Sequence, residues 1–291
     1  MVGTNVNGTG VLAEAHPPVA ARTGRKGVVL IVGGSSGIGL ALADQFAQQG
    51  FDLLLVARSP DRLAAAADKL ARRYAVAVET LALDATLPDA PGRVAATLQK
   101  QSTPLAYAVV TLGVWRGGPL LSADVEALRK TTEINVFAPH ALMRTVVPLL
   151  QPRGGILFVG SLAGCLPLPQ FSVYAASKAH LQAHVLALRQ ELAGSNRTAC
   201  LLAPGIVATD FVASAQGIWT WLIALFASSP QAVAHAGVLG LQSNVPVIVP
   251  GVFWRAVWLG MRLQPAWLLA LWTRGAVGVI QRSKTRGPRS A

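Results

Sequence analysis

The sequence predicts an α/β fold, a doubly wound parallel sheet of about seven strands with a helical extension at the C-terminus. Short apolar, β-branched runs alternate with stretches of helical periodicity, and this alternation is typical of a parallel sheet covered by helices on both faces. A glycine-rich turn separates the first apolar run from the first helical stretch, as in dinucleotide-binding sheets of the Rossmann type.

The expected elements follow one another in order along the chain. Strands are expected near 28–32, 52–57, 76–82, 105–110, 155–160, 198–203 and 246–249, and helices near 37–49, 60–73, 122–148, 173–193 and 229–241. Ligands of such sheets bind beyond the carboxyl ends of the strands. The residues that follow those ends should therefore gather on one rim of the sheet: Gly33, Asp84, Gly113, Ser161 and Pro204.

The glycine turn lies between the apolar run 28–32 and the helical stretch 37–49. Glycine lets the backbone approach a pyrophosphate, and the free N–H groups and positive dipole end of the helix attract it. An ordinary tight turn is the alternative, but the strand before it and the helix after it favour a phosphate site. We expect cofactor contacts at Gly33, Ser35, Ser36, Gly37, Ile38 and Gly39.

A tyrosine and a lysine stand four residues apart at Tyr174 and Lys178, so they lie on one face of a helix, one turn from each other. An ammonium beside a phenol favours the phenolate, and we expect it to lower the pKa of Tyr174 from about 10. Tyr174 would then exchange protons near neutral pH. Ser161, thirteen residues upstream, could hold the same substrate oxygen. An ordinary surface pair is the alternative.

In their order and spacing, the motifs resemble the short-chain dehydrogenase/reductase family over roughly residues 27–250. The glycine turn matches the family's T-G-x-x-x-G-x-G, except that Val32 replaces the leading threonine. The other matches are Asn135 for the helix asparagine, Ser161 for the catalytic serine, Tyr174 and Lys178 for Y-x-x-x-K, and Pro204 to Thr209 for P-G-x-x-x-T.

One family motif, N-N-A-G after the fourth strand, is replaced here by Val110-Thr111-Leu112-Gly113. The glycine is kept, but both asparagine side chains are lost. This difference concerns the local support of the central strand rather than the chemistry.

The resemblance implies a role for each matched residue. Hydride would pass from a nicotinamide to a carbonyl carbon while Tyr174 donates a proton to the oxygen and Ser161 holds that oxygen. Lys178 would bind the nicotinamide ribose and lower the pKa of Tyr174, and Asn135 would order a water in the proton relay. Thr209 would contact the carboxamide. Gly113 and Pro204 complete the implied cofactor contacts.

The end of the second strand indicates which cofactor is used. NAD enzymes place an acid there to bind the ribose 2′-hydroxyl, whereas this chain has Ala57 followed by Arg58. A guanidinium offers a bidentate partner to a 2′-phosphate, so we predict NADP(H), with a further hydroxyl contact from Ser36. A solvated loop residue is the alternative for Arg58. The resemblance implies that Asp84 receives the adenine amino group, and capping of the next helix is its alternative.

The chain of 291 residues is 52% hydrophobic and suits one large domain with appendages. We expect a flexible N-terminal arm over 1–26, an NADP-binding catalytic domain over 27–250 with a lid near 210–227, and a basic, Trp-rich extension over 251–291.

Cysteine and histidine usage indicates free thiols and no metal. Cys165 and Cys200 lie in apolar stretches and suggest a reducing, cytoplasmic compartment. The histidines are His16, His140, His180, His184 and His235. His180 and His184 share a helix face, but their spacing indicates no third ligand, so we expect no metal site.

The last 81 residues, 211–291, contain none of the 13 acidic residues but carry seven Lys or Arg and six of the seven Trp. Aromatic and basic residues without acids suit a lipid headgroup interface, so one hypothesis is an amphipathic interfacial segment over 252–281 that contacts anionic membrane. The other is that these residues pack on the main domain or a second subunit. A nucleic-acid partner is not expected, because no recognition motif accompanies the charge.

An apolar segment, Trp219 to Phe226, falls in the expected lid and favours a small lipophilic carbonyl substrate. The glycine turn, the Val-Ala-Arg-Ser strand end and the basic tail resemble the branch with 3-ketodihydrosphingosine reductases. We therefore expect an NADPH-dependent reductase of a ketone or aldehyde, acting as a homo-oligomer. The alternatives are a non-catalytic NADP-binding regulator and, on the shared Y-x-x-x-K, an epimerase of the sugar-nucleotide type.

Overall fold

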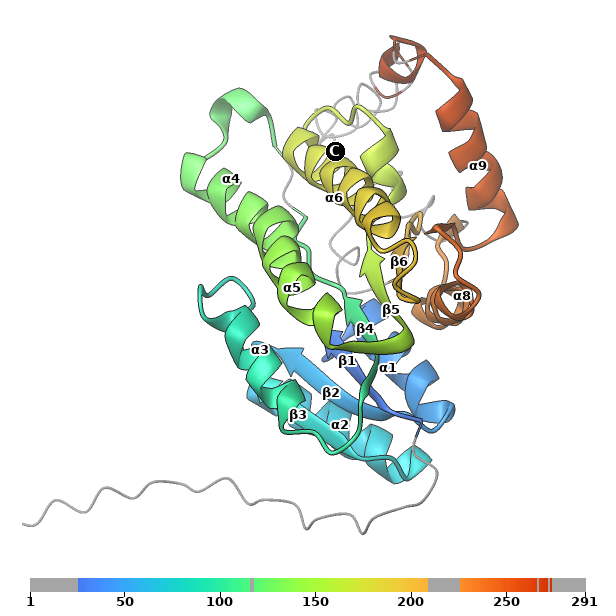
Figure 1. Cartoon of the computed structure of the whole chain (residues 1–291). Coiled ribbons are helices and arrows are strands. Elements are labelled where there is room, and N and C mark those ends of the chain that lie inside the picture. The colour runs from blue at the N-terminus through green and yellow to red at the C-terminus, as the bar shows by residue number, and fades with distance from the viewer. Residues whose placement is uncertain (1–25, 116–117, 209–225, 266, 272, 274–291) are drawn as a thin grey trace, which may run out of the picture.

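Seven parallel strands form one sheet in the order β3-β2-β1-β4-β5-β6-β7 (Figure 1). The computed structural model describes residues 26–115, 118–208, 226–265, 267–271 and 273. The strands are β1 (Val28–Val32), β2 (Asp52–Ala57), β3 (Val78–Ala82), β4 (Leu105–Val110), β5 (Leu150–Val159), β6 (Thr198–Leu202) and β7 (Val247–Ile248). The predicted fold class is confirmed.

Helices cover both faces of this sheet. They are α1 (Gly37–Gln48), α2 (Pro60–Tyr74), α3 (Ala90–Gln99), α4 (Val125–Thr132), α5 (Ala138–Val146), α6 (Ser172–Glu191), α8 (Pro230–Gln242) and α9 (Val252–Leu263). Short turns of 3₁₀-helix are η1 (Leu120–Ser122), η3 (Val147–Leu149) and η4 (Leu162–Cys165). Helices α1, α2 and α8 pack on one face, and α3, α5 and α6 pack on the other.

The central strand β1 shows why the sheet is buried on both sides. Its residues alternate between the two cores: Leu30 and Val32 face α3, α5 and α6, whereas Val29 and Ile31 face α1, α2 and α8. A strand between two helical layers needs apolar residues at every position, and β1 is buried throughout. The order reverses between β2-β1 and β4-β5, which places the ligand crevice beyond the carboxyl ends of β1 and β4.

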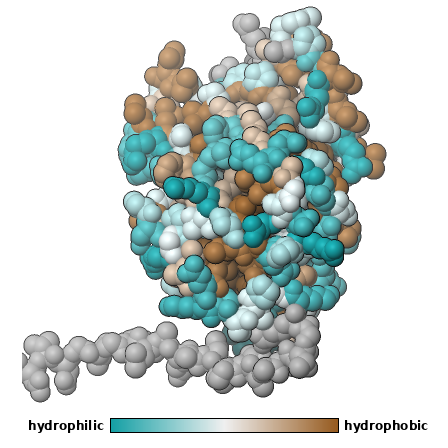
Figure 2. All heavy atoms as spheres, viewed as in Figure 1, coloured by the Kyte–Doolittle hydropathy of each residue, from teal (hydrophilic) through white to brown (hydrophobic). Residues whose placement is uncertain are grey.

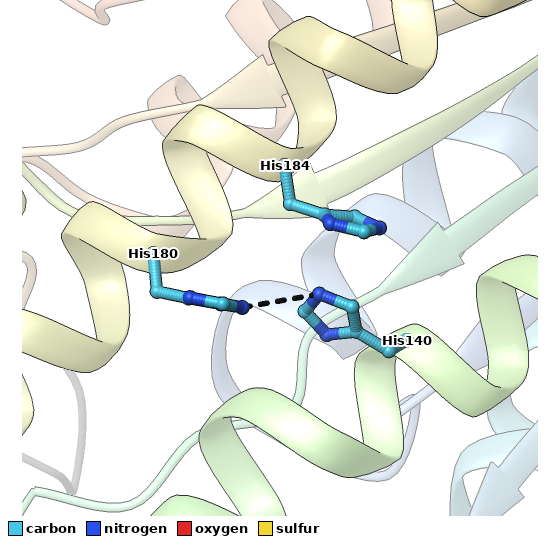
Figure 3. A group of neighbouring side chains, drawn as sticks. All are labelled: His140, His180 and His184. Atoms are coloured by element: carbon cyan, nitrogen blue, oxygen red, sulfur yellow. Dashed lines mark hydrogen bonds between the residues drawn. The ribbon is translucent and has the colours of Figure 1, made fainter.

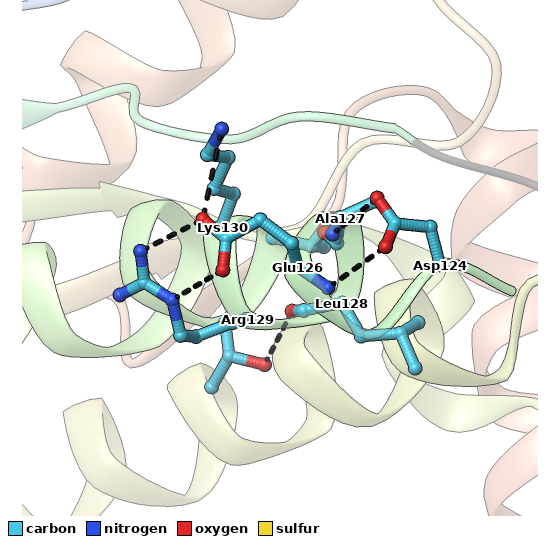
Figure 4. Close-up of polar contacts among 8 residues, drawn as sticks. Asp124, Glu126, Ala127, Leu128, Arg129 and Lys130 are labelled. Atoms are coloured by element: carbon cyan, nitrogen blue, oxygen red, sulfur yellow. Dashed lines mark hydrogen bonds and ion pairs between the residues drawn. The ribbon is translucent and has the colours of Figure 1, made fainter.

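The helix expected over 122–148 is not continuous. It begins at Val125, because the Asp124 carboxylate accepts hydrogen bonds from the Glu126 and Ala127 amides, each at 3.2 Å (Figure 4). Glu126 also pairs with Arg129 at 2.9 Å. After α4 the chain forms a π-helical turn, η2 (Glu133–Phe137), before α5 begins. Side-chain periodicity did not reveal this wider turn, which carries Asn135.

Two elements were missed or misplaced by the sequence patterns. No helix was predicted over α3, because Pro91 and Gly92 fall in its first turn, where proline is tolerated but weakens any helical pattern. Strand β5 begins at Leu150, five residues before the expected start of 155. Its first six residues include Pro152, Gly154 and Gly155, residues that normally indicate a turn.

The C-terminal extension packs against the main domain through the inner face of α9. The Trp254 ring covers Gly205, where an added Cβ would lie 2.2 Å from the ring, and its indole N–H donates to the Phe226 carbonyl at 3.1 Å. No helix in the described part of the chain combines the length and hydrophobicity that crossing a bilayer requires. Outside the described residues lie 1–25 of the expected arm (1–26), Thr209, 210–225 of the expected lid (210–227) and 274–291.

Candidate active site

The glycine turn after β1 is built for close backbone approach. Gly33 has φ +88°, and a Cβ on Gly39 would lie 2.1 Å from the Gly33 carbonyl oxygen, so neither position accepts a side chain. Thr111 locks the turn to β4, because its hydroxyl donates to the Val32 carbonyl at 2.8 Å.

The N-terminus of α1 opens directly from this turn. Its N-cap residue, Ser36, makes no side-chain capping hydrogen bond, and the first N–H groups of a helix have no partner within the helix. Ser35, Gly37 and Ile38 lie on the same turn. Unpartnered amides at the positive end of a helix dipole suit an anion, so the turn fits the pyrophosphate of a dinucleotide.

Lys178 lies buried on α6, behind the ends of two central strands. Its Nζ donates to the Val159 carbonyl at 3.1 Å and to the Leu112 carbonyl at 3.3 Å. Burial lowers the pKa of the ammonium from 10.5 to about 8, because a low-dielectric site disfavours charge. Gly113 leaves room for it, since a Cβ there would lie 2.9 Å from Nζ. Gly113, the one residue kept from the family's N-N-A-G motif, therefore has a steric function.

Tyr174 lies one turn before Lys178 and is also buried, with 6% of its surface exposed. Burial raises the pKa of its phenol, and a hydrogen bond with Ser161 acts in the opposite direction. The expectation that Lys178 lowers this pKa is therefore wrong for the protein alone. The ammonium lies 5.9 Å from the ring centroid and is held by backbone carbonyls, so the cost of burying a phenolate dominates.

Ser161 follows β5 and opens the 3₁₀ turn η4. Its hydroxyl accepts a hydrogen bond from the Ala163 amide at 3.1 Å. The amide of Leu162, between these two residues, donates to the Pro204 carbonyl at 3.0 Å. These bonds hold the loops after β5 and β6 together. Ser161, which the strand-end argument placed on the rim, is hydrogen-bonded to Tyr174 on α6.

Asn135 is fully buried in the π turn and joins three segments. Its carboxamide oxygen accepts from the Val114 amide at 2.8 Å, and its Nδ2 donates to the Val114 carbonyl at 3.1 Å and to the Ser177 hydroxyl at 3.0 Å. Ser177 precedes Lys178 on α6. The described contacts of Asn135 are thus to protein atoms that position the loop after β4 and the helix carrying Lys178.

Arg58 and Asp84 lie at the far end of the crevice, after β2 and β3. Arg58 is exposed. The pKa of Asp84 is lowered mainly by hydrogen bonding from the Thr86 amide and also by the charge of Arg58. Asp84 accepts from the Thr86 amide at 3.0 Å and hydroxyl at 2.8 Å. It closes this turn and does not cap α3, whose N-cap is Asp89.

Trp115 and Ser177 were not singled out from the sequence. The Trp115 ring lies 4.7 Å from the Tyr174 ring and 4.2 Å from that of Phe171, which forms an aromatic wall beside the phenol. Its position two residues after Gly113 was the available signal. Ser177 carried none, because a serine within a helix has no distinctive pattern.

Comparison with known proteins agrees with this geometry. Residues 27–217 match the family model of the short chain dehydrogenases. A short-chain dehydrogenase from Sphingobium yanoikuyae, solved in complex with NADPH, is 26% identical, with a TM-score of 0.71, and the match covers 91% of this chain and 98% of that one.

Two similar curated relatives are named as reductases. A very-long-chain 3-oxoacyl-CoA reductase from Eremothecium gossypii is 35% identical over 59% of this chain and 52% of its own length. A 3-dehydrosphinganine reductase from Arabidopsis thaliana is 31% identical over 60% of this chain and 54% of its own length. The matched stretch therefore spans about half the length of each relative.

Replacing Asn135 with alanine should destabilise the protein by about 1–3 kcal/mol, because it leaves the buried Val114 amide and carbonyl without partners. Urea denaturation measures the change in the free energy of unfolding. Thr132→Ala is the matched control, since this exposed residue lies in the same helical run and should change stability by less than about 0.5 kcal/mol. Equal midpoints for the two variants would contradict a joining role for Asn135.

Proposed function

Because this chain belongs to the short-chain dehydrogenase family, we propose that it is an NADPH-dependent reductase of a ketone or aldehyde group on a lipophilic substrate. The observation that carries this proposal is the hydrogen-bonded pair of hydroxyls, the half-buried Ser161 and the buried Tyr174, with Lys178 one helical turn after the phenol. This group lies on the same rim as the N-terminus of α1, which in this proposal binds the pyrophosphate of the cofactor.

In the proposed reaction the bound cofactor supplies the hydride. The Ser161 hydroxyl holds the carbonyl oxygen of the substrate, and the Tyr174 phenol donates a proton to that oxygen as charge develops on it. The raised pKa of Tyr174 supports the reductive direction, because the phenol keeps its proton through neutral pH. Lys178 would contact the nicotinamide ribose, and Asn135 would hold the loop and helix around it.

The aromatic wall supports a lipophilic substrate. Trp115, which is 41% exposed, and Phe171 present apolar surface beside the phenol. The names of the fungal and plant relatives, a very-long-chain 3-oxoacyl-CoA reductase and a 3-dehydrosphinganine reductase, point to ketones on lipids. We take a lipid ketone as the substrate class.

Arg58 supports NADPH over NADH. It follows β2 at the end of the crevice where the adenosine ribose of a bound dinucleotide would lie, and Ala57 provides no carboxylate to repel a 2′-phosphate. The solved relative from Sphingobium yanoikuyae is described with NADPH. In this proposal Arg58 and Ser36 bind the 2′-phosphate and Asp84 lies near the adenine.

We also propose peripheral contact with anionic membrane through the outer face of α9. Val252, Leu259 and Leu263 form one stripe on this face, with exposures of 85%, 50% and 84%, and Arg255 and Arg262 flank it. Figure 2 shows apolar side chains gathered over α9 and, at the same end of the molecule, over the start of α4. An apolar stripe flanked by arginines suits a headgroup interface.

A homo-oligomeric state remains a prediction.

Tyr174→Phe should lower kcat for NADPH-dependent reduction by roughly 10²–10⁴-fold, because it removes the proton donor while keeping the ring against Trp115. Turnover is followed by NADPH oxidation with long-chain 3-keto lipids, steroids and small ketones, and the dissociation constant of NADPH should not change. Tyr107→Phe, on β4 away from the crevice, serves as the control. Substantial activity in the Tyr174 variant would refute the assigned role.

Arg58→Asp should shift cofactor preference towards NADH, because the new carboxylate repels the 2′-phosphate and accepts from a 2′-hydroxyl. We expect the ratio of kcat/KM for NADPH over NADH to fall by at least about tenfold. The control is Arg62→Asp, which makes the same charge change on the exposed surface of α2. An unchanged ratio in the Arg58 variant would rule out a 2′-phosphate contact.

The double variant Val252→Asp/Leu263→Asp should no longer float with vesicles that contain phosphatidylserine, whereas the native chain should. The variant interrupts the apolar stripe and adds charges that the anionic surface repels. Leu239→Asp, an exposed site on α8, is the control and should float like the native chain. The membrane contact would be disproved if the native chain and the double variant floated equally.

A further inference from the structure

Three histidine side chains outside the crevice converge between α5 and α6 (Figure 3). His140 lies on α5, and His180 and His184 lie four residues apart on α6. Each offers one ring nitrogen, and the three nitrogens lie within 4.8 Å of one another. Sequence spacing had placed only His180 and His184 on one face; the fold supplies the third imidazole.

The distances within this cluster suit a shared ion. The Nε2 atoms of His140 and His180 lie 3.2 Å apart. Two nitrogens bound to one tetrahedral zinc at about 2.0–2.1 Å stand about 3.3–3.4 Å apart. The His184 nitrogen lies within 4.8 Å of the other two, so its side chain would have to rotate to bring it to the same ion.

A second contact orients the His140 ring. Its Nδ1 lies 2.5 Å from the Val136 carbonyl oxygen, which can only accept, so Nδ1 carries the proton and Nε2 presents its lone pair to the other two imidazoles. Metal-bound histidines commonly donate their second ring N–H to a backbone carbonyl in this way. His140 is therefore oriented as a ligand before any ion binds.

The donor atoms also select the kind of ion, because all three are imidazole nitrogens. Imidazole ligands suit zinc, copper and nickel rather than magnesium or calcium.

We propose that His140, His180 and His184 form a binding site for one divalent transition-metal ion of the zinc class, which clasps α5 to α6. The fourth position of a tetrahedral ion would be taken by water, because His180 is exposed on the outer side. The ion would be structural, because its three ligands join α5 to α6, the helix that carries Lys178, and are not among the residues of the crevice.

Zinc titration of the full chain, prepared without a histidine tag and stripped with a chelator, tests this site. Isothermal titration calorimetry should give one Zn²⁺ per native chain, and Mg²⁺ should give no binding. His180→Ala should weaken zinc binding at least tenfold, and His140→Ala/His184→Ala should abolish it. His235→Ala is the control. His235 lies on α8, outside the cluster, and forms a hydrogen bond with Gln45, so its loss should leave zinc binding unchanged.

Two further measurements keep the test decisive. Bound Co²⁺ should give visible absorption bands of four-coordinate geometry, and excess Zn²⁺ should raise the melting temperature of the native chain but not of the double variant. If the double variant fails to fold, His180→Ala decides, because its side chain is exposed. The proposal would be overturned if the native chain did not bind zinc stoichiometrically. It would also be overturned if the native chain and His180→Ala bound zinc with equal affinity.

Discussion

The buried ammonium of Lys178 is the constraint on which the rest of the site depends. Removing a cation from water costs several kcal/mol unless its donors are satisfied. The Leu112 and Val159 carbonyls meet this need at the carboxyl ends of β4 and β5, so α6 must sit close to the sheet. The close approach of Lys178 also requires glycine at position 113, because a Cβ there would lie 2.9 Å from Nζ. Even so, the pKa of the ammonium falls to about 8, so the stabilisation is only partial.

The position of α6 is in turn fixed by the π turn. A wider turn at Glu133–Phe137 lies where Asn135 bonds both the loop after β4 and Ser177, and such turns often occur at functional sites. Because the Val136 carbonyl in this turn also binds His140, one local irregularity orients the asparagine inwards and the imidazole towards α6. The crevice and the proposed metal site therefore both depend on the π turn.

The sequence predicted the elements whose cause is local and left out those whose cause is tertiary. Strand burial, the glycine turn and the Tyr174–Lys178 spacing follow from short patterns, and the structure confirms the predicted parallel sheet of seven strands. Helical spacing predicts that Tyr174 and Lys178 are close together but not how deeply they are buried. The predicted lowering of the Tyr174 pKa was wrong for this reason, because burial raises it. The packing of Trp254 and the approach of His140 each depend on residues distant in the chain, which no spacing reveals.

Helix α9 couples the rim of the site to the surface proposed for membrane contact. Its inner face is fixed, because the Trp254 ring fills the space over Gly205 that any Cβ would occupy and its N–H is bonded to Phe226. The outer stripe lies on the opposite side of the same 12-residue helix, so its orientation relative to the loops after β5 and β6 is fixed as well. A surface attached to the rim by one rigid helix would hold the crevice in a single orientation to a bilayer. In the proposed function, a lipid ketone would then approach Tyr174 from a constant direction.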